Sequence, residues 1–143
     1  MSKSQDPVIV EQAFSSSKEE LWKAITEMEQ MKKWFFENIP AFKAEVGFQT
    51  SFNVLAGERN FPHRWTILEV IPQEKIVYDW KYDGYEGEGL VTFELEETEG
   101  KTLLKLTAEG METFPQEIPE FSRESCQGGW NYFIKEQLKE YLI

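Results

Sequence analysis

The sequence has few of the residues that build disulfide frameworks, metal centres or basic surfaces. It contains one cysteine, Cys126, and one histidine, His63. A single cysteine excludes an internal disulfide, and a single histidine excludes a histidine-rich metal site. Lys and Arg number 15 against 26 Asp and Glu, which gives a net charge of −11. A field of that sign repels phosphate backbones and anionic lipids, so we expect neither nucleic acid nor a membrane surface as a partner.

The sequence also lacks long apolar runs and low-complexity tracts. No apolar run approaches the roughly 20 residues that span a bilayer, so no membrane insertion is expected. The first thirty residues show no basic segment followed by an apolar one, the pattern of a secretory signal. No repeat or linker divides the chain. These absences predict one cytoplasmic domain over residues 1–143, with the polar Met1–Asp6 disordered.

Aromatic residues, in contrast, are abundant. The chain has 11 Phe, 5 Trp and 5 Tyr, which make up 15% of its residues. Large rings are costly to expose to water. They therefore either fill the core of this domain or line a cavity in it.

The first forty residues alternate between two hydrophobic periods. Val8–Phe14 has apolar residues at period two and is predicted to be a strand. Ser16 with Glu19, or Ser17 with Glu20, has the spacing of a capping box and predicts a helix over Lys18–Thr26. Met31, Trp34 and Phe35 continue the helical period in a second short helix, which ends before Pro40.

Period two then continues for about seventy residues with short turns between the segments. A hairpin turn is predicted at Gly57–Asn60, and tight turns at Pro72–Glu74 and Glu99–Gly100. Closely spaced strands imply an antiparallel sheet, because parallel strands need long crossovers. The predicted strands include Phe48–Val54, Arg64–Ile71, Lys75–Tyr82, Glu88–Thr98 and Lys101–Glu109.

The chain ends in a predicted amphipathic helix of about 20 residues that begins near Glu120. Cys126, Trp130, Phe133, Gln137 and Tyr141 form one stripe on it, with Ile134, Leu138 and Leu142 beside that stripe. Only the sheet offers a surface large enough to cover the stripe. We therefore predict an α+β domain in which a strongly curved sheet packs around this helix and leaves a cavity beside it.

Two glycines lie inside this predicted helix, at Gly128 and Gly129. Glycine disfavours a helix by about 1 kcal/mol per residue relative to alanine. The pair is expected either to allow close approach of another backbone or to open space beside Trp130.

Several segments together resemble a known family. They are "KKWF" after the first helices, "ILEVIPQEKIVYDWKY" from Ile67 to Tyr82, the pair "LVTFELEE" and "TLLKLTAEG", and "GGWNYF" in the last helix. They resemble the START-like (SRPBCC) superfamily and, within it, the family named for the activator of the heat-shock protein 90 ATPase. The resemblance implies a helix-grip fold, like that of the birch-pollen allergen: six to seven antiparallel strands around the C-terminal helix, with two short helices after the first strand. It also implies a hydrophobic ligand cavity.

The chain departs from the family pattern in two places. Many relatives carry tandem Trp followed by Gly-Pro after the second helix, whereas Trp34 is followed here by Phe35, Phe36 and Glu37, so the mouth of the cavity is expected to differ. The eukaryotic cochaperones also have a separate N-terminal chaperone-binding domain. A chain of 143 residues leaves no room for it, which argues against chaperone activation.

A non-enzymatic binding protein is the first functional hypothesis. It would hold a small hydrophobic or aromatic molecule between sheet and helix, without a cofactor or metal. One alternative is a cyclase or hydrolase in which His63, Asp79 or Glu69 acts as acid or base, and another is a stress-linked partner of the chaperone. No residue is assigned as catalytic. The residues expected to line the ligand site are Trp34, His63, Trp65, Tyr78, Trp80, Phe93, Trp130 and Phe133.

Other motifs favour plain structural roles. The glycines of Gly84–Gly89 lack the spacing of a dinucleotide fingerprint and predict a flexible loop, or a lid over the cavity. Cys126 and His63 suit a nucleophile and base only if the fold brings them together, and Cys126 is otherwise a small buried apolar residue. Asp79 lies on the strand face opposite Trp80 and is predicted to be solvated. The glutamates of Glu94–Glu99 likewise form a solvated face, not a metal cage.

Overall fold

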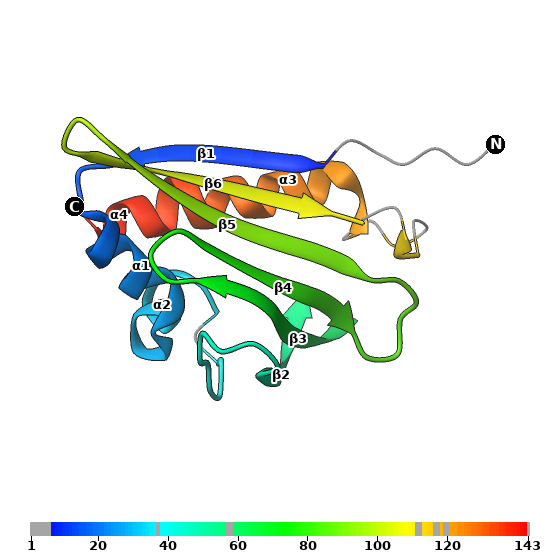
Figure 1. Cartoon of the computed structure of the whole chain (residues 1–143). Helices are drawn as coiled ribbons and strands as arrows, with labels where there is room; N and C mark the ends of the chain where they lie inside the picture. The colour runs from blue at the N-terminus through cyan, green and yellow to red at the C-terminus, as the bar shows by residue number, and fades with distance from the viewer. Residues whose placement is uncertain are drawn as a thin grey trace.

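The computed structural model describes residues 7–36, 38–56, 59–110, 113–115, 118 and 121–142. The predicted disorder of Met1–Asp6 therefore lies outside the described residues. Within them, six strands form one antiparallel sheet in the order β1-β6-β5-β4-β3-β2 (Figure 1). The strands are β1 Val8–Phe14, β2 Gln49–Ala56, β3 Arg59–Ile71, β4 Lys75–Tyr82, β5 Gly89–Thr98 and β6 Lys101–Glu109.

Two short helices follow β1, as predicted: α1 over Lys18–Thr26 and α2 over Met28–Trp34. Of the two candidate capping boxes, Ser17 with Glu20 forms. The Glu20 N–H donates to Ser17 Oγ and the Ser17 N–H donates to Glu20 Oε1, each at 3.1 Å. The two helices are separated at Glu27, whose extended backbone (φ −92°, ψ 125°) caps the end of α1 and the start of α2.

The predicted start of β3 was wrong by five residues. Arg59 and Asn60, which were assigned to a turn, already pair with β2, while the rest of that turn, Gly57 and Glu58, lies outside the described residues. Pro62 obscured this part of the strand, because proline cannot donate a ladder hydrogen bond. It is tolerated here because the β3–β4 register starts one residue later, and the Pro62 carbonyl accepts a hydrogen bond from the Asp83 N–H at 2.9 Å.

The β5–β6 hairpin turns at the predicted residues. Glu99 and Gly100 both have positive φ, of 49° and 80°. Two such residues between paired strands make the primed turn that matches the twist of a hairpin. The turn fixes the register in which Thr98 pairs with Lys101.

The C-terminal helix is continuous but changes pitch. It runs as α3 over Arg123–Asn131, as a π-helical segment over Tyr132–Leu138 and as α4 over Lys139–Tyr141. The helix was predicted, but the π segment was not. The buried side chains of this helix are Trp130, Ile134 and Leu138, whereas Tyr141 is exposed. The buried stripe is therefore shifted toward Ile134 and Leu138, which were predicted to lie beside the main stripe.

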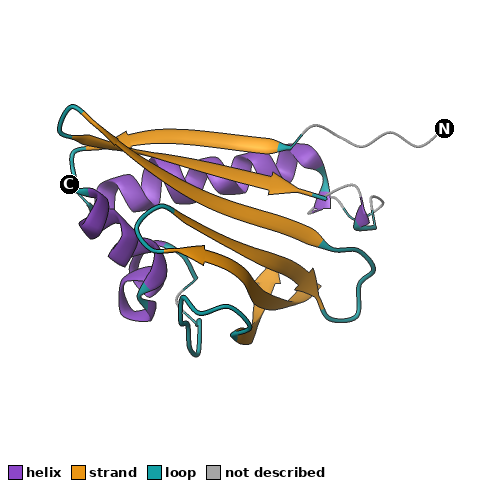
Figure 2. Ribbon diagram, viewed as in Figure 1, coloured by secondary structure: helices purple, strands orange, loops and turns teal. Residues whose placement is uncertain are grey.

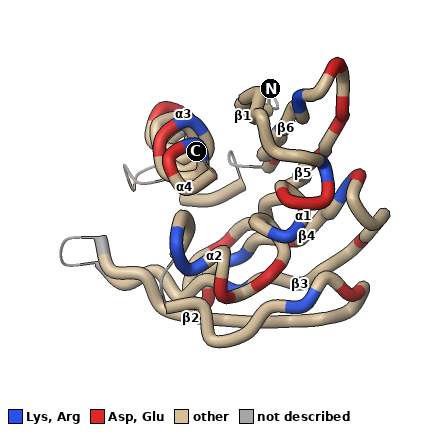
Figure 3. The backbone as a smooth tube through the Cα atoms, turned by 90° about the vertical axis from the view of Figure 1, so that its left-hand side faces the viewer, with Lys and Arg blue, Asp and Glu red and all other residues tan. Residues whose placement is uncertain are grey.

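The sheet curves around this helix, and α1 and α2 cover the same face (Figures 2 and 3). One principal core lies between the two layers, and Trp34, Trp65, Tyr78 and Phe93 are among its fully buried side chains. The predicted helix-grip architecture is therefore confirmed. In the described part of the chain, no helix is long and apolar enough to cross a membrane.

Candidate functional site

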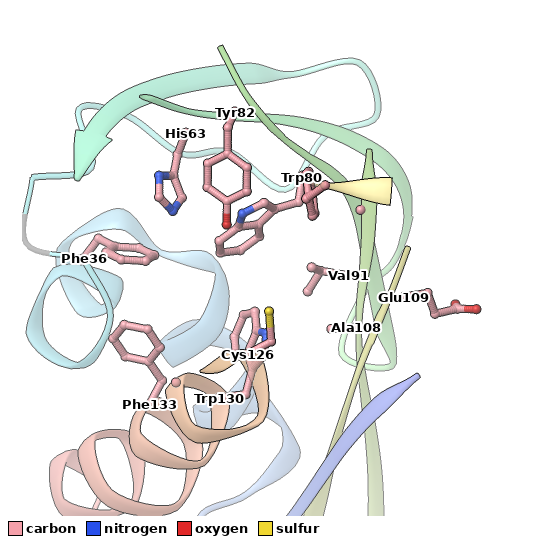
Figure 4. A pocket seen from close by; sticks show the side chains of 13 residues that line it. Phe36, His63, Trp80, Tyr82, Val91, Ala108, Glu109, Cys126, Trp130 and Phe133 are labelled. Carbon is pink, nitrogen blue, oxygen red and sulfur yellow. The ribbon is translucent and has the colours of Figure 1, made fainter. Parts of the chain in front are cut away.

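A pocket of about 160 Å³ lies between the inner face of the sheet and the first half of the C-terminal helix. Figure 4 shows its aromatic walls: His63 and Tyr82 reach in from β3 and β4, and Trp130 and Phe133 face them from the helix. Nearly all of the lining is apolar or aromatic. The lining residues are Phe36, His63, Trp80, Tyr82, Gly89, Val91, Ala108, Glu109, Phe114, Cys126, Gly129, Trp130 and Phe133.

Four of the residues expected at the ligand site lie in this wall: His63, Trp80, Trp130 and Phe133. Their rings form one connected surface. Trp80 contacts His63 and Trp130 edge-on, with ring centroids 5.3 and 5.5 Å apart. The alternation of side chains along a strand explains why His63 and Trp80 lie in the same wall. Both point to the inner face of the sheet, from the adjacent strands β3 and β4.

The other four, Trp34, Trp65, Tyr78 and Phe93, lie in the core behind the wall and are at most 1% exposed. Trp34 comes from α2, and its indole N–H donates to the Ala24 carbonyl at 2.7 Å. Trp65, Tyr78 and Phe93 belong to β3, β4 and β5. None of the four lines the pocket in this structure.

Several wall residues were not identified from the sequence. Tyr82 shares the parity of Trp80 and could have been included on that ground. Phe36 lies in the stretch after Trp34 where the sequence departs from the family pattern. That departure predicted a different mouth for the cavity, but it did not predict that the Phe36 side chain would line the pocket. Phe114 lies in an irregular segment, where no periodicity indicates which side chains turn inward.

Gly129 also lines the pocket, which decides between the two interpretations of the helix glycines. A Cβ added at Gly128 or Gly129 would meet no atom within 4 Å, so neither glycine allows a close backbone approach. The first of the two alternatives is therefore excluded. At Gly129 the missing side chain instead leaves space in the pocket.

The Gly84–Gly89 segment borders the pocket through Gly89 and is tied to the segment before the C-terminal helix. The Thr113 hydroxyl accepts a hydrogen bond from the Glu88 N–H at 2.9 Å. Gly87, at φ 106°, lies so close that a Cβ would come within 2.5 Å of the Thr113 carbonyl oxygen. The absence of a side chain at Gly87 therefore lets these two segments pack together beside the pocket, which Gly89 and Phe114 line.

His63 presents a neutral hydrogen-bond acceptor to the pocket. Its Nδ1 lies 2.8 Å from the Phe61 carbonyl oxygen, which can only accept, so Nδ1 carries the proton and Nε2 is left as the acceptor. The ring stacks on Phe52 at 5.2 Å and is buried. This desolvation lowers the pKa of His63 to about 4, against the opposing effect of the Phe61 hydrogen bond. His63 is therefore uncharged at pH 7.

The Tyr82 and Cys126 side chains of the wall are also neutral at pH 7. Burial raises the pKa of the Tyr82 hydroxyl above its ordinary value, although a hydrogen bond with Trp80 opposes the shift. Burial raises the pKa of the Cys126 thiol to about 11. Figure 4 places Cys126 across the pocket from His63. A protonated thiol is a weak nucleophile, so the geometry gives no support to a cysteine–histidine pair.

Asp79 lies outside this pocket, on the outer face of the sheet as its parity predicts, but it is not solvated. Only 8% of the residue is exposed, and Lys81 Nζ approaches Oδ2 at 3.5 Å. Burial, followed by the charge of Glu88, raises the pKa of Asp79. Neighbouring outer-face residues such as Leu68 and Leu90 surround it, which strand alternation alone does not reveal.

The pocket favours neutral ligands. Its lining contains no Lys or Arg among the described residues, and its carboxylate, Glu109, points away from the centre in Figure 4. Desolvating an ion there would lack a compensating opposite charge. In the described residues, no group of three His, Cys, Asp or Glu side chains is placed to hold a metal ion.

Comparisons with known proteins agree with this architecture. Protein CV1439 of Chromobacterium violaceum is 23% identical over 96% of both chains, with a TM-score of 0.80. Protein MLL2253 of Mesorhizobium loti is 27% identical over 95% of this chain and 96% of that one, with a TM-score of 0.73. The Aha1 dimer from Colwellia psychrerythraea gives a TM-score of 0.75 at 19% identity, covering 96% of each chain.

A search of the curated proteins found no match. The family model described as "Activator of Hsp90 ATPase homolog 1-like protein" matches residues 15–143. This range starts next to the capping box of α1 and includes the whole sheet except β1, together with every residue of the pocket wall. The chain therefore belongs to the family of activator of Hsp90 ATPase homolog 1-like proteins.

Proposed function

We propose that this domain binds a small neutral aromatic molecule in the pocket between β3, β4 and the C-terminal helix. The observation that carries the proposal is the pocket of about 160 Å³, walled by rings and holding a neutral His63 acceptor and a protonated Tyr82 hydroxyl. An apolar cavity of roughly 150 Å³ accommodates benzene. One substituted ring is therefore the size of ligand that this pocket suits.

The polar groups favour a hydroxyl substituent on that ring. A phenol can donate to His63 Nε2 and accept from the Tyr82 hydroxyl. A benzoate would enter as an anion with no cation in the wall to pair with it. We expect phenol to bind with a Kd of about 0.1–1 mM, in keeping with its few heavy atoms, and benzoate at least ~10-fold more weakly.

Titration of the tryptophan fluorescence, excited at 295 nm to limit absorption by the ligand, measures both affinities. Trp80 and Trp130 line the pocket and should respond to its occupant. Saturable quenching by phenol supports the proposal. Linear quenching, equal for phenol and benzoate, would remove it.

The helix glycines provide a matched pair of variants. We expect Gly129→Leu to weaken phenol binding at least ~10-fold, because its side chain would grow into space that the pocket now occupies. Gly128→Leu adds the same side chain one residue away, outside the lining, and should bind phenol like the wild type. Each should stabilise the helix by up to about 1 kcal/mol. Equal phenol affinity in the two variants would contradict the assignment of the pocket.

A second candidate function is contact with the Hsp90 chaperone, which the description of the matched family favours. We expect the purified chain to retain Hsp90 from the same cell in a pull-down, and to raise its ATPase rate if it acts as an activator. A chain carrying Gly129→Leu serves as the control that separates this contact from the pocket. Absence of retained Hsp90 would dismiss this candidate without affecting the first.

A further inference from the structure

Two hydrogen-bond donors in the principal core have no partner. Trp65 Nε1 and the Tyr78 hydroxyl are completely buried, and neither forms a hydrogen bond within the described residues. A buried polar group without a partner is costly, and native proteins rarely retain one without a reason. The neighbouring Trp34, equally buried, has its indole N–H satisfied by the Ala24 carbonyl. The two unpaired donors therefore call for an explanation.

The register of β3 and β4 places both donors directly behind the pocket. His63 pairs with Tyr82, Trp65 with Trp80, and Ile67 with Tyr78. The inner face therefore carries three successive cross-strand pairs, which we call the first, second and third rungs. The pocket covers the first rung and Trp80 of the second. Trp65 lies on the second rung and Tyr78 on the third, with about 7 Å between rungs. A longer pocket along the same strands would meet both donors.

Phenylalanines from one loop fill the space over these rungs. Phe35 stacks on Trp65 with ring centroids 5.5 Å apart, and Phe36 lies 6.2 Å from the same ring. Phe42 contacts both Trp65 and Tyr78, at 6.2 and 6.0 Å. We call Phe35, Phe36 and Phe42 the aromatic plug. Phe35 and Phe36 also contact Phe133 of the pocket wall, at 4.8 and 5.1 Å.

The loop that carries the plug is held mainly by its side chains. Its backbone is anchored at the two ends, where the Phe35 N–H donates to Met31 and the Gly47 N–H donates to Ile67. Between them, residues 40–44 make no backbone hydrogen bond to another described residue. Opening this segment breaks few backbone hydrogen bonds, so the buried ring contacts of the plug account for most of its free-energy cost. A ligand that replaces the ring contacts of the plug can therefore displace it.

We propose that the aromatic plug occupies the inner half of a longer binding site, and that Trp65 Nε1 and the Tyr78 hydroxyl recognise its ligand. The Trp65 indole N–H can only donate and the Tyr78 hydroxyl can also donate, so an acceptor oxygen on the ligand satisfies both groups. The buried apolar surroundings require the ligand to be neutral. The roughly 7 Å from Trp80 on the second rung, which the pocket already reaches, to Tyr78 on the third suits two fused rings. The ligand class is thus a neutral two-ring compound with a carbonyl oxygen at its inner end. This inference rests on the proposed function, because the ligand enters through the same pocket.

The test compares 2-acetylnaphthalene with 2-isopropylnaphthalene, which has nearly the same shape but no oxygen. In NMR titrations the Trp65 indole N–H, identified by its absence in a Trp65→Phe variant, should shift downfield with the ketone and not with the hydrocarbon. In calorimetric titrations the ketone should bind at least ~10-fold more tightly than the hydrocarbon. Equal affinities, or a Trp65 indole resonance that the ketone leaves unchanged, would overturn the inference.

Two variants separate recognition from packing. Tyr78→Phe keeps the ring and removes the unpaired hydroxyl, so it should lose at least ~5-fold of its affinity for the ketone while unfolding no earlier than the wild type. Phe35→Leu shortens the plug and should bind the ketone more tightly. Unchanged ketone binding by Tyr78→Phe would overturn the assignment of the donor.

Phenol separates the two proposals. It fits the outer pocket alone, so Tyr78→Phe should bind it normally. Phenol binding without ketone recognition would refute the longer site and leave the proposed function intact. Failure of both ligands would refute both.

Discussion

Replacement of Trp34 by alanine is expected to lower the free energy of unfolding by about 3–5 kcal/mol, the range measured when a fully buried large ring is removed. Trp34 is 1% exposed and stacks on Phe35 with ring centroids 4.7 Å apart. Its removal would leave a cavity beneath the aromatic plug and would leave the Ala24 carbonyl without its hydrogen bond. Both effects act in the same direction. Urea denaturation followed by circular dichroism measures the loss.

Trp22→Ala is the matched control for this prediction. Trp22 lies on α1, is half-buried and packs only at the edge of the principal core. Its replacement should cost about 1 kcal/mol. If Trp34→Ala lowers the free energy of unfolding no more than Trp22→Ala does, Trp34 is not packed in the core as described. The aromatic plug that packs on Trp34 would then also be described incorrectly.

Stability should fall by about 3 kcal/mol as the pH decreases from 7 to 4, because of His63 alone. Folding lowers the pKa of His63 from 6.5 to about 4, so between these values the unfolded chain binds a proton that the folded chain does not. The unfolded state is therefore favoured as the pH falls. By pH 5 about 2 kcal/mol of this loss should already be present.

The single histidine makes the effect measurable as a difference between two proteins. His63→Phe keeps a ring in the aromatic wall but cannot titrate, so wild type minus variant isolates the contribution of His63. The subtraction matters because Asp79, with its raised pKa, contributes in the opposite sense and stabilises the folded chain as the pH falls. Parallel stability curves for the two proteins between pH 7.5 and 5 would show that His63 is not desolvated.

Most of the fold follows from local patterns in the sequence. Period-two alternation placed Ile76, Tyr78 and Trp80 on the inner face of β4, where all three are buried. The turn at Glu99–Gly100 followed from glycine, and the start of α1 from a serine and a glutamate. These features depend on interactions between residues close in sequence, which is why one sequence was sufficient to predict them.

The candidate site was only half predictable, for a physical reason. Parity tells which side chains face inward, but it does not tell which inward rings touch one another and which border a void. Trp65 and Trp80 have the same parity and pair across β3 and β4, yet only Trp80 reaches the pocket, because the aromatic plug covers Trp65. The plug and Phe114 come from irregular segments, whose side-chain directions depend on tertiary packing.

The pairing of β1 with β6 has a consequence for the order of assembly. Val8 pairs with Ala108 and Phe14 with Thr102, so the first strand meets a partner about a hundred residues later in the chain. Contacts so distant in sequence form slowly, because a long loop must be closed before they contribute. During synthesis β1 must wait until β6 has left the ribosome, while the β2–β3 hairpin can already pair. The C-terminal helix follows all six strands in the chain and brings Trp130 and Phe133, so the wall of the pocket is completed only after the whole sheet has been synthesised.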